Sequence, residues 1–109
     1  MDVPVTWPRL LETARLHGGQ LHILPGEQPH VRESGQWRPL LTPKLSSDDI
    51  IALFWSMADE ESKDLLKRIG EVQFRRPHAV PEQISFWITA KVVNGRLQLH
   101  AVQERNTVP

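Results

Sequence analysis

Alternating apolar and polar residues near the C-terminus form the clearest pattern in the chain. They occupy 84–93 and 96–103 on either side of Asn94-Gly95, the preferred pair for a two-residue type I′ turn. The pattern therefore predicts an antiparallel hairpin over these residues. Its core side should carry the apolar pairs Val92–Leu97, Ala90–Leu99 and Ile88–Ala101, with Phe86 further along the same side. Its other side should be mostly polar, with the pairs Trp87–Val102, Thr89–His100 and Lys91–Gln98.

Helical spacing marks the N-terminal segment and the segment after Ser46. Thr6-Trp7-Pro8 is typical of a helix start, because proline is tolerated in the first turn. Gly18-Gly19 is expected to end this first helix. Ser46 and Asp49 form a capping-box pattern, and Leu45 is placed to pack on Ile50. The second helix should end near Met57. The core faces are predicted to be Trp7, Leu10, Leu11 and Ala14 in the first helix, and Ile50, Leu53, Phe54 and Met57 in the second.

A third helix is expected to begin at Asp59 and to end at Gly70. We expect its buried residues to be Leu65, Leu66 and Ile69. Glu61, Lys63, Lys67 and Arg68 are expected to solvate its outer face.

The remaining segments have extended or turn patterns. Leu21 and Ile23 indicate a short strand ended by Pro25-Gly26, and 31–33 and 36–40 flank Ser34-Gly35 as a tight hairpin. Val72 and Phe74 begin another extended segment. The stretch from Arg75 to Pro81 holds two prolines and is interpreted as a loop, and 104–109 as a frayed tail.

This order of elements predicts an α+β fold, in which an antiparallel sheet carries helices on one face in a PAS-like arrangement. At 109 residues the chain is expected to be a single domain over 1–109, with its core within about 7–103. Domains of this size hold one hydrophobic core.

Composition narrows the classes of function. Thirteen basic and thirteen acidic residues give a formal net charge of zero, so nucleic acid is not an expected partner. The chain has no cysteine, which excludes disulfides and thiolate chemistry. No segment approaches the ~20 apolar residues that span a bilayer. We therefore expect a cytoplasmic protein without membrane insertion.

No residue pattern points to catalysis, a metal or a cofactor. The five histidines are His17, His22, His30, His78 and His100, and they lack the local spacing of a zinc site. The pairs Asp48-Asp49 and Glu60-Glu61 stand at helix starts, where negative charge stabilises the helix dipole. The sequence holds no phosphate-binding glycine loop and no nucleophile elbow. We expect a protein that is not an enzyme.

Two surface features are candidate binding elements. Arg75-Arg76 beside His78 is a small basic patch, either a phosphate contact or a solvated loop. Trp87 alternates with the core-facing Phe86 and Ile88 and therefore points outward, either as an interface anchor or under a terminal segment. The candidate partner-binding residues are Trp87, Thr89, His100, Val102, Arg75 and Arg76.

Several short motifs follow one another in an order that is known from a protein family. They are Leu21-His22 in a strand, Gly26 to Pro29 in a turn, Arg32 to Gly35 in a hairpin, Leu41-Thr42-Pro43, a helix entered near Ser46, and Gly70-Glu71 after an acidic-capped helix. Over about 10–103 this order resembles the N-terminal domain of PilT-like ATPases, the motors of type IV pilus retraction, and of their type II secretion relatives.

The sequence departs from the family at some positions. Gln20 stands where the family has Asp, and Arg75-Arg76 and the stretch 84–87 replace other strand sequences. The chain ends where the motor domain of the family would begin, and it carries no Walker motif. ATP hydrolysis is therefore not implied.

The resemblance implies a non-catalytic, PAS-like interaction or regulatory module. In the family this domain packs against the motor domain of a neighbouring subunit. A stand-alone copy is expected to bind such an ATPase, another pilus component or a second copy of itself. Two alternatives stay open at this point: a PAS-like sensor of a small ligand, and an excised N-terminal domain of a longer ATPase.

Overall fold

The computed structural model describes residues 6–78 and 84–104. Along the chain these residues form α1 (Trp7–Leu16), β1 (Gln20–Ile23), β2 (His30–Glu33), β3 (Gln36–Pro39), α2 (Ser47–Met57), α3 (Glu60–Ile69), β4 (Glu71–His78), β5 (Ile84–Val93) and β6 (Arg96–Gln103). No helix within these residues is both long and apolar enough to cross a membrane.

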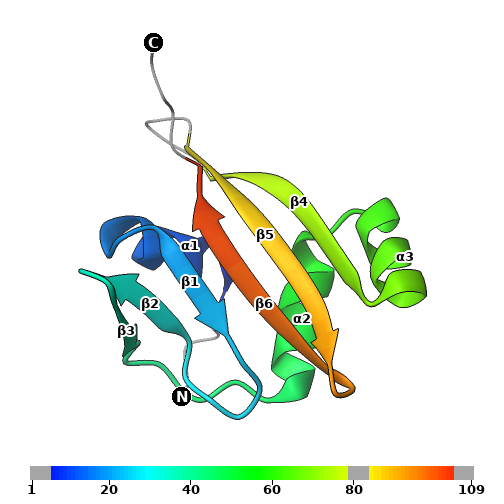
Figure 1. The fold of residues 1–109 in the computed structure, drawn as a ribbon, viewed down its shortest axis with the longest axis horizontal. Helices are drawn as coiled ribbons and strands as arrows, with labels where there is room; N and C mark the ends of the chain where they lie inside the picture. Colours follow the sequence, from blue (N-terminus) through cyan, green and yellow to red (C-terminus); the bar gives the residue numbers. More distant parts are fainter. Residues whose placement is uncertain (1–5, 79–83, 105–109) are drawn as a thin grey trace.

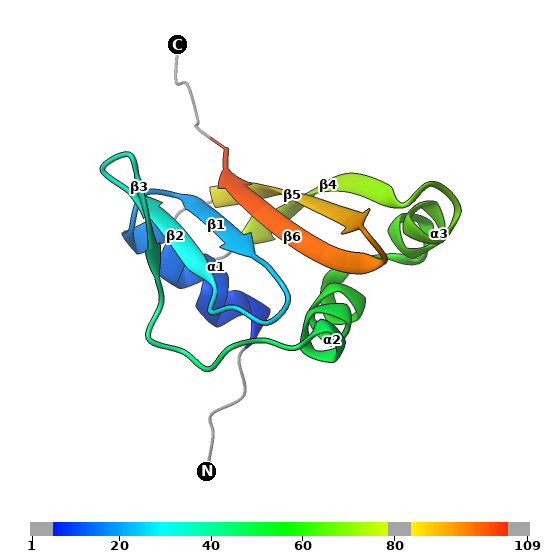
Figure 2. The same ribbon diagram turned by 60° about the horizontal axis from the view of Figure 1, so that its bottom comes forward.

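The strands form one six-stranded antiparallel sheet in the order β3-β2-β1-β6-β5-β4. Helices α1 and α2 lie behind the sheet in Figure 1, and Figure 2 shows both of them below it. Helix α3 lies beside β4, at the edge of the sheet. The predicted α+β fold is confirmed.

The β5–β6 hairpin has the predicted register at every pair. Asn94 and Gly95 adopt φ values of 52° and 76°, as a type I′ turn requires. The core side is buried with one exception, Val92, which is 41% exposed and was expected in the core. The backbone N–H of Val92 donates to the carbonyl oxygen of Gly70. Val92 therefore lies beside a residue that has no side chain to cover it.

Helix α2 begins with the predicted capping box. The Ser46 hydroxyl accepts from the Asp49 backbone N–H (3.1 Å), and the Asp49 carboxylate accepts from the Ser46 backbone N–H (2.9 Å). Leu45 and Ile50 are both buried, as residues of a hydrophobic staple are. The four predicted core residues of α2 are buried as well.

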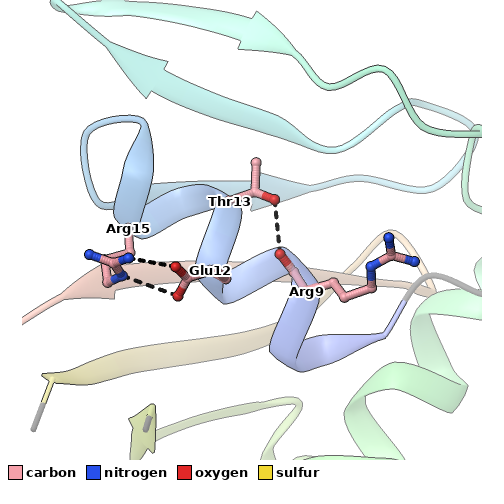
Figure 3. Close-up of polar contacts among 4 residues, drawn as sticks. All are labelled: Arg9, Glu12, Thr13 and Arg15. Carbon is pink, nitrogen blue, oxygen red and sulfur yellow. Dashed lines mark hydrogen bonds and ion pairs between the residues drawn. The ribbon is translucent and has the colours of Figure 1, made fainter. Parts of the chain in front are cut away.

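Helix α1 buries its predicted face through Trp7, Leu10, Leu11 and Ala14. Figure 3 shows that polar side chains on other sides of the helix bond within it. Glu12 pairs with Arg15, and the Thr13 hydroxyl donates to the Arg9 carbonyl oxygen (2.9 Å). The Glu12–Arg15 pair supports the helix locally, whereas the Thr13 hydroxyl satisfies its own hydrogen bond within the helix and adds no stability.

Helix α3 is less buried than its sequence predicts. Asp59 caps it through the Ser62 backbone N–H (2.7 Å), and Gly70 ends it in the left-handed region, as expected. Leu66 is buried and Leu65 partly so, but Ile69 is 69% exposed. Because α3 packs at the edge of the sheet, only a narrow stripe of the helix is covered. The predicted burial of Ile69 is wrong for this reason.

Strand β4 extends further than predicted. Residues 75–78, interpreted as a loop, continue the strand and pair with β5 as far as His78↔Ile84. Pro77 is tolerated because β4 is an edge strand, and an edge strand is paired on one side only. The rest of the predicted loop, 79–83, lies outside the described residues.

The predicted tail begins one residue too early. Glu104 donates its backbone N–H to the Ser85 carbonyl oxygen (2.8 Å) and pairs with Arg75 through its carboxylate. It is therefore tied to the sheet, whereas 105–109 lie outside the described residues.

Replacing Ser46 with alanine should lower the free energy of unfolding by about 1 kcal/mol, the usual loss for a capping side chain. Denaturant unfolding of both proteins measures this. Serine-to-alanine replacement at Ser47, inside the first turn, is the control. An unchanged midpoint for Ser46→Ala would contradict the capping box.

Gly18→Ala should destabilise the chain by roughly 3 kcal/mol or more, because it combines an unfavourable backbone conformation with a clash. Gly18 has φ +104°, and a Cβ there would lie 2.1 Å from the Arg32 carbonyl oxygen. Gly26 is the matched control, since it has φ +79° and nothing within 4 Å of a Cβ. Thermal melts that shift equally for both variants would show that the approach of Gly18 to β2 is unimportant.

Candidate functional site

The face of the sheet turned away from α1 and α2 is the candidate site, and we call it the outer face. It is turned to the viewer in Figure 1, where none of the labelled helices lies over it. Strand register aligns two rows of side chains on it. One row contains Gln20, Val102, Trp87 and Arg75, and the other contains His30, His22, His100, Thr89 and Gln73.

Three rings meet near the middle of this face. His22 of β1 lies opposite His100 of β6, with ring centroids 5.5 Å apart. Trp37 of β3 lies 5.6 Å from His22 and 6.1 Å from His100. We call His22, His100 and Trp37 the histidine–tryptophan cluster. The Arg32 guanidinium adds a positive charge 5.9 Å from the Trp37 ring, within the range of a cation–π contact.

The two imidazoles of the cluster are partly desolvated. Burial lowers the pKa of His22 below its ordinary value of 6.5; His30 lowers it further, whereas Glu27 raises it. Burial also lowers the pKa of His100, and His22 adds to this effect. Both side chains are therefore neutral at physiological pH. His30 donates from Nδ1 to the Gln28 carbonyl oxygen (2.8 Å), which fixes its ring beside them.

The predicted binding residues of the closing hairpin all lie on the outer face. Trp87 is 40% exposed and Val102 36% exposed. They face each other across β5 and β6, as do Thr89 and His100 in the next row. The Thr89 hydroxyl accepts a long hydrogen bond from Gln73 (3.4 Å).

Arg75 and Arg76 do not form one basic patch. Arg75 pairs with Trp87 in the register and bonds to Glu104 (2.7 Å) on the outer face. Arg76 pairs with Phe86 and donates to the Met57 carbonyl oxygen (2.8 Å) at the end of α2. Because neighbouring residues of a strand point to opposite faces, Arg76 stabilises the helix terminus and is absent from the outer face.

Sequence reasoning missed Trp37, His22 and Arg32 as members of this surface. Arg32 and Trp37 face each other across the Ser34-Gly35 hairpin, so their pairing follows from its register. His22 meets His100 only because β1 pairs with the distant β6. Alternation of His22 with the buried Leu21 and Ile23 was the available signal, since it places His22 on the outer face.

Other regions make weaker sites. Lys63 and Lys67 of α3 lie 5.2 and 5.0 Å from the Trp55 ring of α2, a contact between helices that the sequence analysis assigned to solvation. No group of three or more metal-binding side chains occurs within 6–78 and 84–104. An open hollow of about 420 Å³ is lined by Leu24, Pro25, Glu27, Val93, Asn94, Arg96 and Gln98.

The described core contains few polar groups that could hold a small ligand. Its buried side chains are apolar except for Ser62 and the indole N–H of Trp7, which has no hydrogen-bond partner among the described residues. A small-ligand pocket combines apolar walls with convergent polar groups. In the described part of the chain, side chains able to recognise a partner therefore gather on the outer face rather than in the interior.

Comparison with known proteins finds the fold of this chain within larger solved structures. No family model matches the sequence, and no curated protein matches it. Among solved structures, the pilus retraction motor PilT with bound ADP matches with a TM-score of 0.84 and 18% identity, over 96% of this chain and 31% of PilT. The Legionella pneumophila ATPase DotB matches with a TM-score of 0.76 and 20% identity, over 100% of this chain and 32% of DotB.

The chain thus spans about a third of the length of both structures. At these identities the likeness concerns the fold. The resemblance to the N-terminal domain of PilT-like ATPases, inferred from the order of short motifs, is confirmed at that level: the chain has a fold found within PilT and DotB.

Proposed function

We propose that this chain is a non-catalytic protein-interaction module that binds a pilus or secretion ATPase, or a component associated with one, through the outer face of its sheet. The observation that carries the proposal is the exposure of Trp87 and Trp37, each 40% exposed on one sheet face. Half-exposed tryptophans are common anchors of protein interfaces.

The fold supports the choice of partner. PilT is described as a pilus retraction motor and DotB as an ATPase. A domain with the fold of one third of such a motor is suited to pack against another part of one. The proposal applies whether the domain acts alone or within a longer ATPase.

A small-ligand sensor is less well supported. The polar groups of the buried side chains in the described core are the Ser62 hydroxyl, in the first turn of α3, and the Trp7 indole N–H in α1, and they do not converge on one site. The open hollow between the β5–β6 turn and the β1–β2 connection lies at the surface. Neither feature offers an enclosed polar site for a ligand.

The purified chain should neither hydrolyse ATP nor bind it tightly, because its sequence has no glycine-rich loop leading into a helix, which would be needed to gather the phosphates. A phosphate-release assay and calorimetric titration with Mg-ATP measure this. Heat-treated protein is the control for contaminating activity. A rate of ATP hydrolysis that stays proportional to the amount of the chain through successive purification steps would contradict the proposal.

A photo-reactive amino acid at Lys91, an exposed position on the outer face, should cross-link to a pilus or secretion ATPase in the native cell. Lys91 pairs with Gln98 across the hairpin. The same amino acid at Arg68, exposed on α3, is the control. Cross-links from Lys91 only to proteins unrelated to pilus or secretion ATPases would overturn the proposed function. So would capture of the same proteins in equal amounts from Lys91 and from Arg68.

Trp87→Ala should weaken association with the captured partner by roughly 2 kcal/mol, about thirtyfold in Kd, since a buried aromatic anchor contributes this much. Its thermal melt should change little, because the side chain is already 40% exposed. Trp55→Ala is the matched control: Trp55 is 41% exposed but lies on α2. A large loss of stability with intact association would place Trp87 in the core instead.

A further inference from the structure

We infer that the histidine–tryptophan cluster and Arg32 form a subsite for a carboxylate-bearing segment of a protein partner. This inference rests on the proposed function, because it names the chemistry that the outer face recognises. It adds what an exposed tryptophan alone does not give, a preference for acidic partners.

Unused hydrogen-bonding capacity is the first support. Within 6–78 and 84–104, neither His22 nor His100 makes a hydrogen bond, although both are partly buried, whereas His17 and His30 each make one. A neutral imidazole carries one donor and one acceptor. The cluster therefore presents two N–H donors to whatever covers the outer face.

Charge is the second support. Arg32 is exposed and has no carboxylate partner among the described residues. By contrast, Arg75 on the same face is already paired with Glu104, and Glu33 of β2 pairs with His17 and Arg38. A carboxylate is the acceptor of an unmodified protein segment that complements a guanidinium and two imidazole donors.

The charge of Arg32 argues against a second copy as the occupant. In a symmetric dimer whose two-fold axis passed beside the cluster, the Arg32 guanidinium groups of the two chains would oppose each other. Like charges opposed in an interface disfavour association. A heterologous acidic segment avoids this repulsion, and its apolar side chains can cover Trp37.

Binding of a carboxylate has a pH signature with a definite sign. The titratable and charged groups around the two imidazoles are His30 and Arg32 on β2 and Glu27 in the β1–β2 connection. Trp37 on β3 and Thr89 on β5 carry no charge. In the free chain the pKa of each imidazole lies below 6.5. A carboxylate beside an imidazole raises its pKa. Binding therefore takes up protons, so affinity should increase as pH falls through the raised pKa of the bound imidazoles.

Selection of short random peptides displayed on phage against the immobilised full chain tests the inference. The recovered peptides should be enriched in Asp and Glu. Their binding should weaken about tenfold in Arg32→Gln and in His22→Gln/His100→Gln, as expected for lost hydrogen bonds to a charged group. Peptides with Asn and Gln in place of Asp and Glu should bind the unmodified chain as weakly as the original peptides bind these variants. Affinity should also be higher near pH 6 than near pH 7.5, and the double histidine variant should lose this difference.

Arg68→Gln is the matched control, because it removes one positive charge from α3, where Arg68 pairs with Asp64. Arg32 is exposed, so Arg32→Gln should fold even if the histidine variants do not.

Neutral or basic peptides that bind the outer face, as shown by loss of binding in Trp87→Ala, would overturn this inference and leave the proposed function standing. Failure to recover any peptide whose binding depends on the outer face would overturn the inference, whereas the cross-linking experiment tests the proposed function independently. A dimer of the chain that Arg32→Gln disrupts would overturn it in favour of a second copy.

Discussion

The pairing of β6 with both β5 and β1 is the constraint on which the rest of the structure depends. The Asn94-Gly95 turn sets the β5–β6 register, and the alternation of side chains then assigns each residue of β6 to a face. Leu97, Leu99 and Ala101 enter the core. A slip of one residue would bury His100 and expose these apolar side chains, so burial and turn geometry enforce the same register.

That register also creates the outer face. Pairing of β1 with β6 places His22 opposite His100, and pairing of β2 with β3 places Arg32 opposite Trp37. The result is a partly desolvated group of aromatic rings and donors on a face that α1 and α2 leave uncovered. Desolvation keeps the two imidazoles neutral in the free chain. A sheet covered by helices on one side can thus hold its core with one face and recognise a partner with the other.

The helices differ in how firmly the sheet holds them. Helices α1 and α2 bury four residues each, including Trp7 and Phe54. Helix α3 sits at the edge beside β4 and buries a narrower stripe, around Leu66. Arg76 and the lysines on Trp55 connect this edge to α2 through polar and cation–π contacts. The edge of the fold therefore relies more on surface contacts than the centre does.

Local sequence determined the elements that are governed by short-range chemistry. The Ser46–Asp49 box, the Asn94-Gly95 turn and the two-residue period of β5 and β6 were predictable, because caps, turns and alternation act over a few residues. The same period assigned Trp87 to the outer face. Only the tertiary structure decided how much of α3 is covered, whether the Arg75–His78 stretch is paired, and which distant strands are neighbours. Ile69 is exposed because α3 lies at the edge of the sheet, and Arg76 is separated from Arg75 because the strand continues through both and alternates its side chains. His22 meets His100 and Trp37 because sheet order makes β1 the neighbour of β6, although the chain separates His22 from His100 by 78 positions.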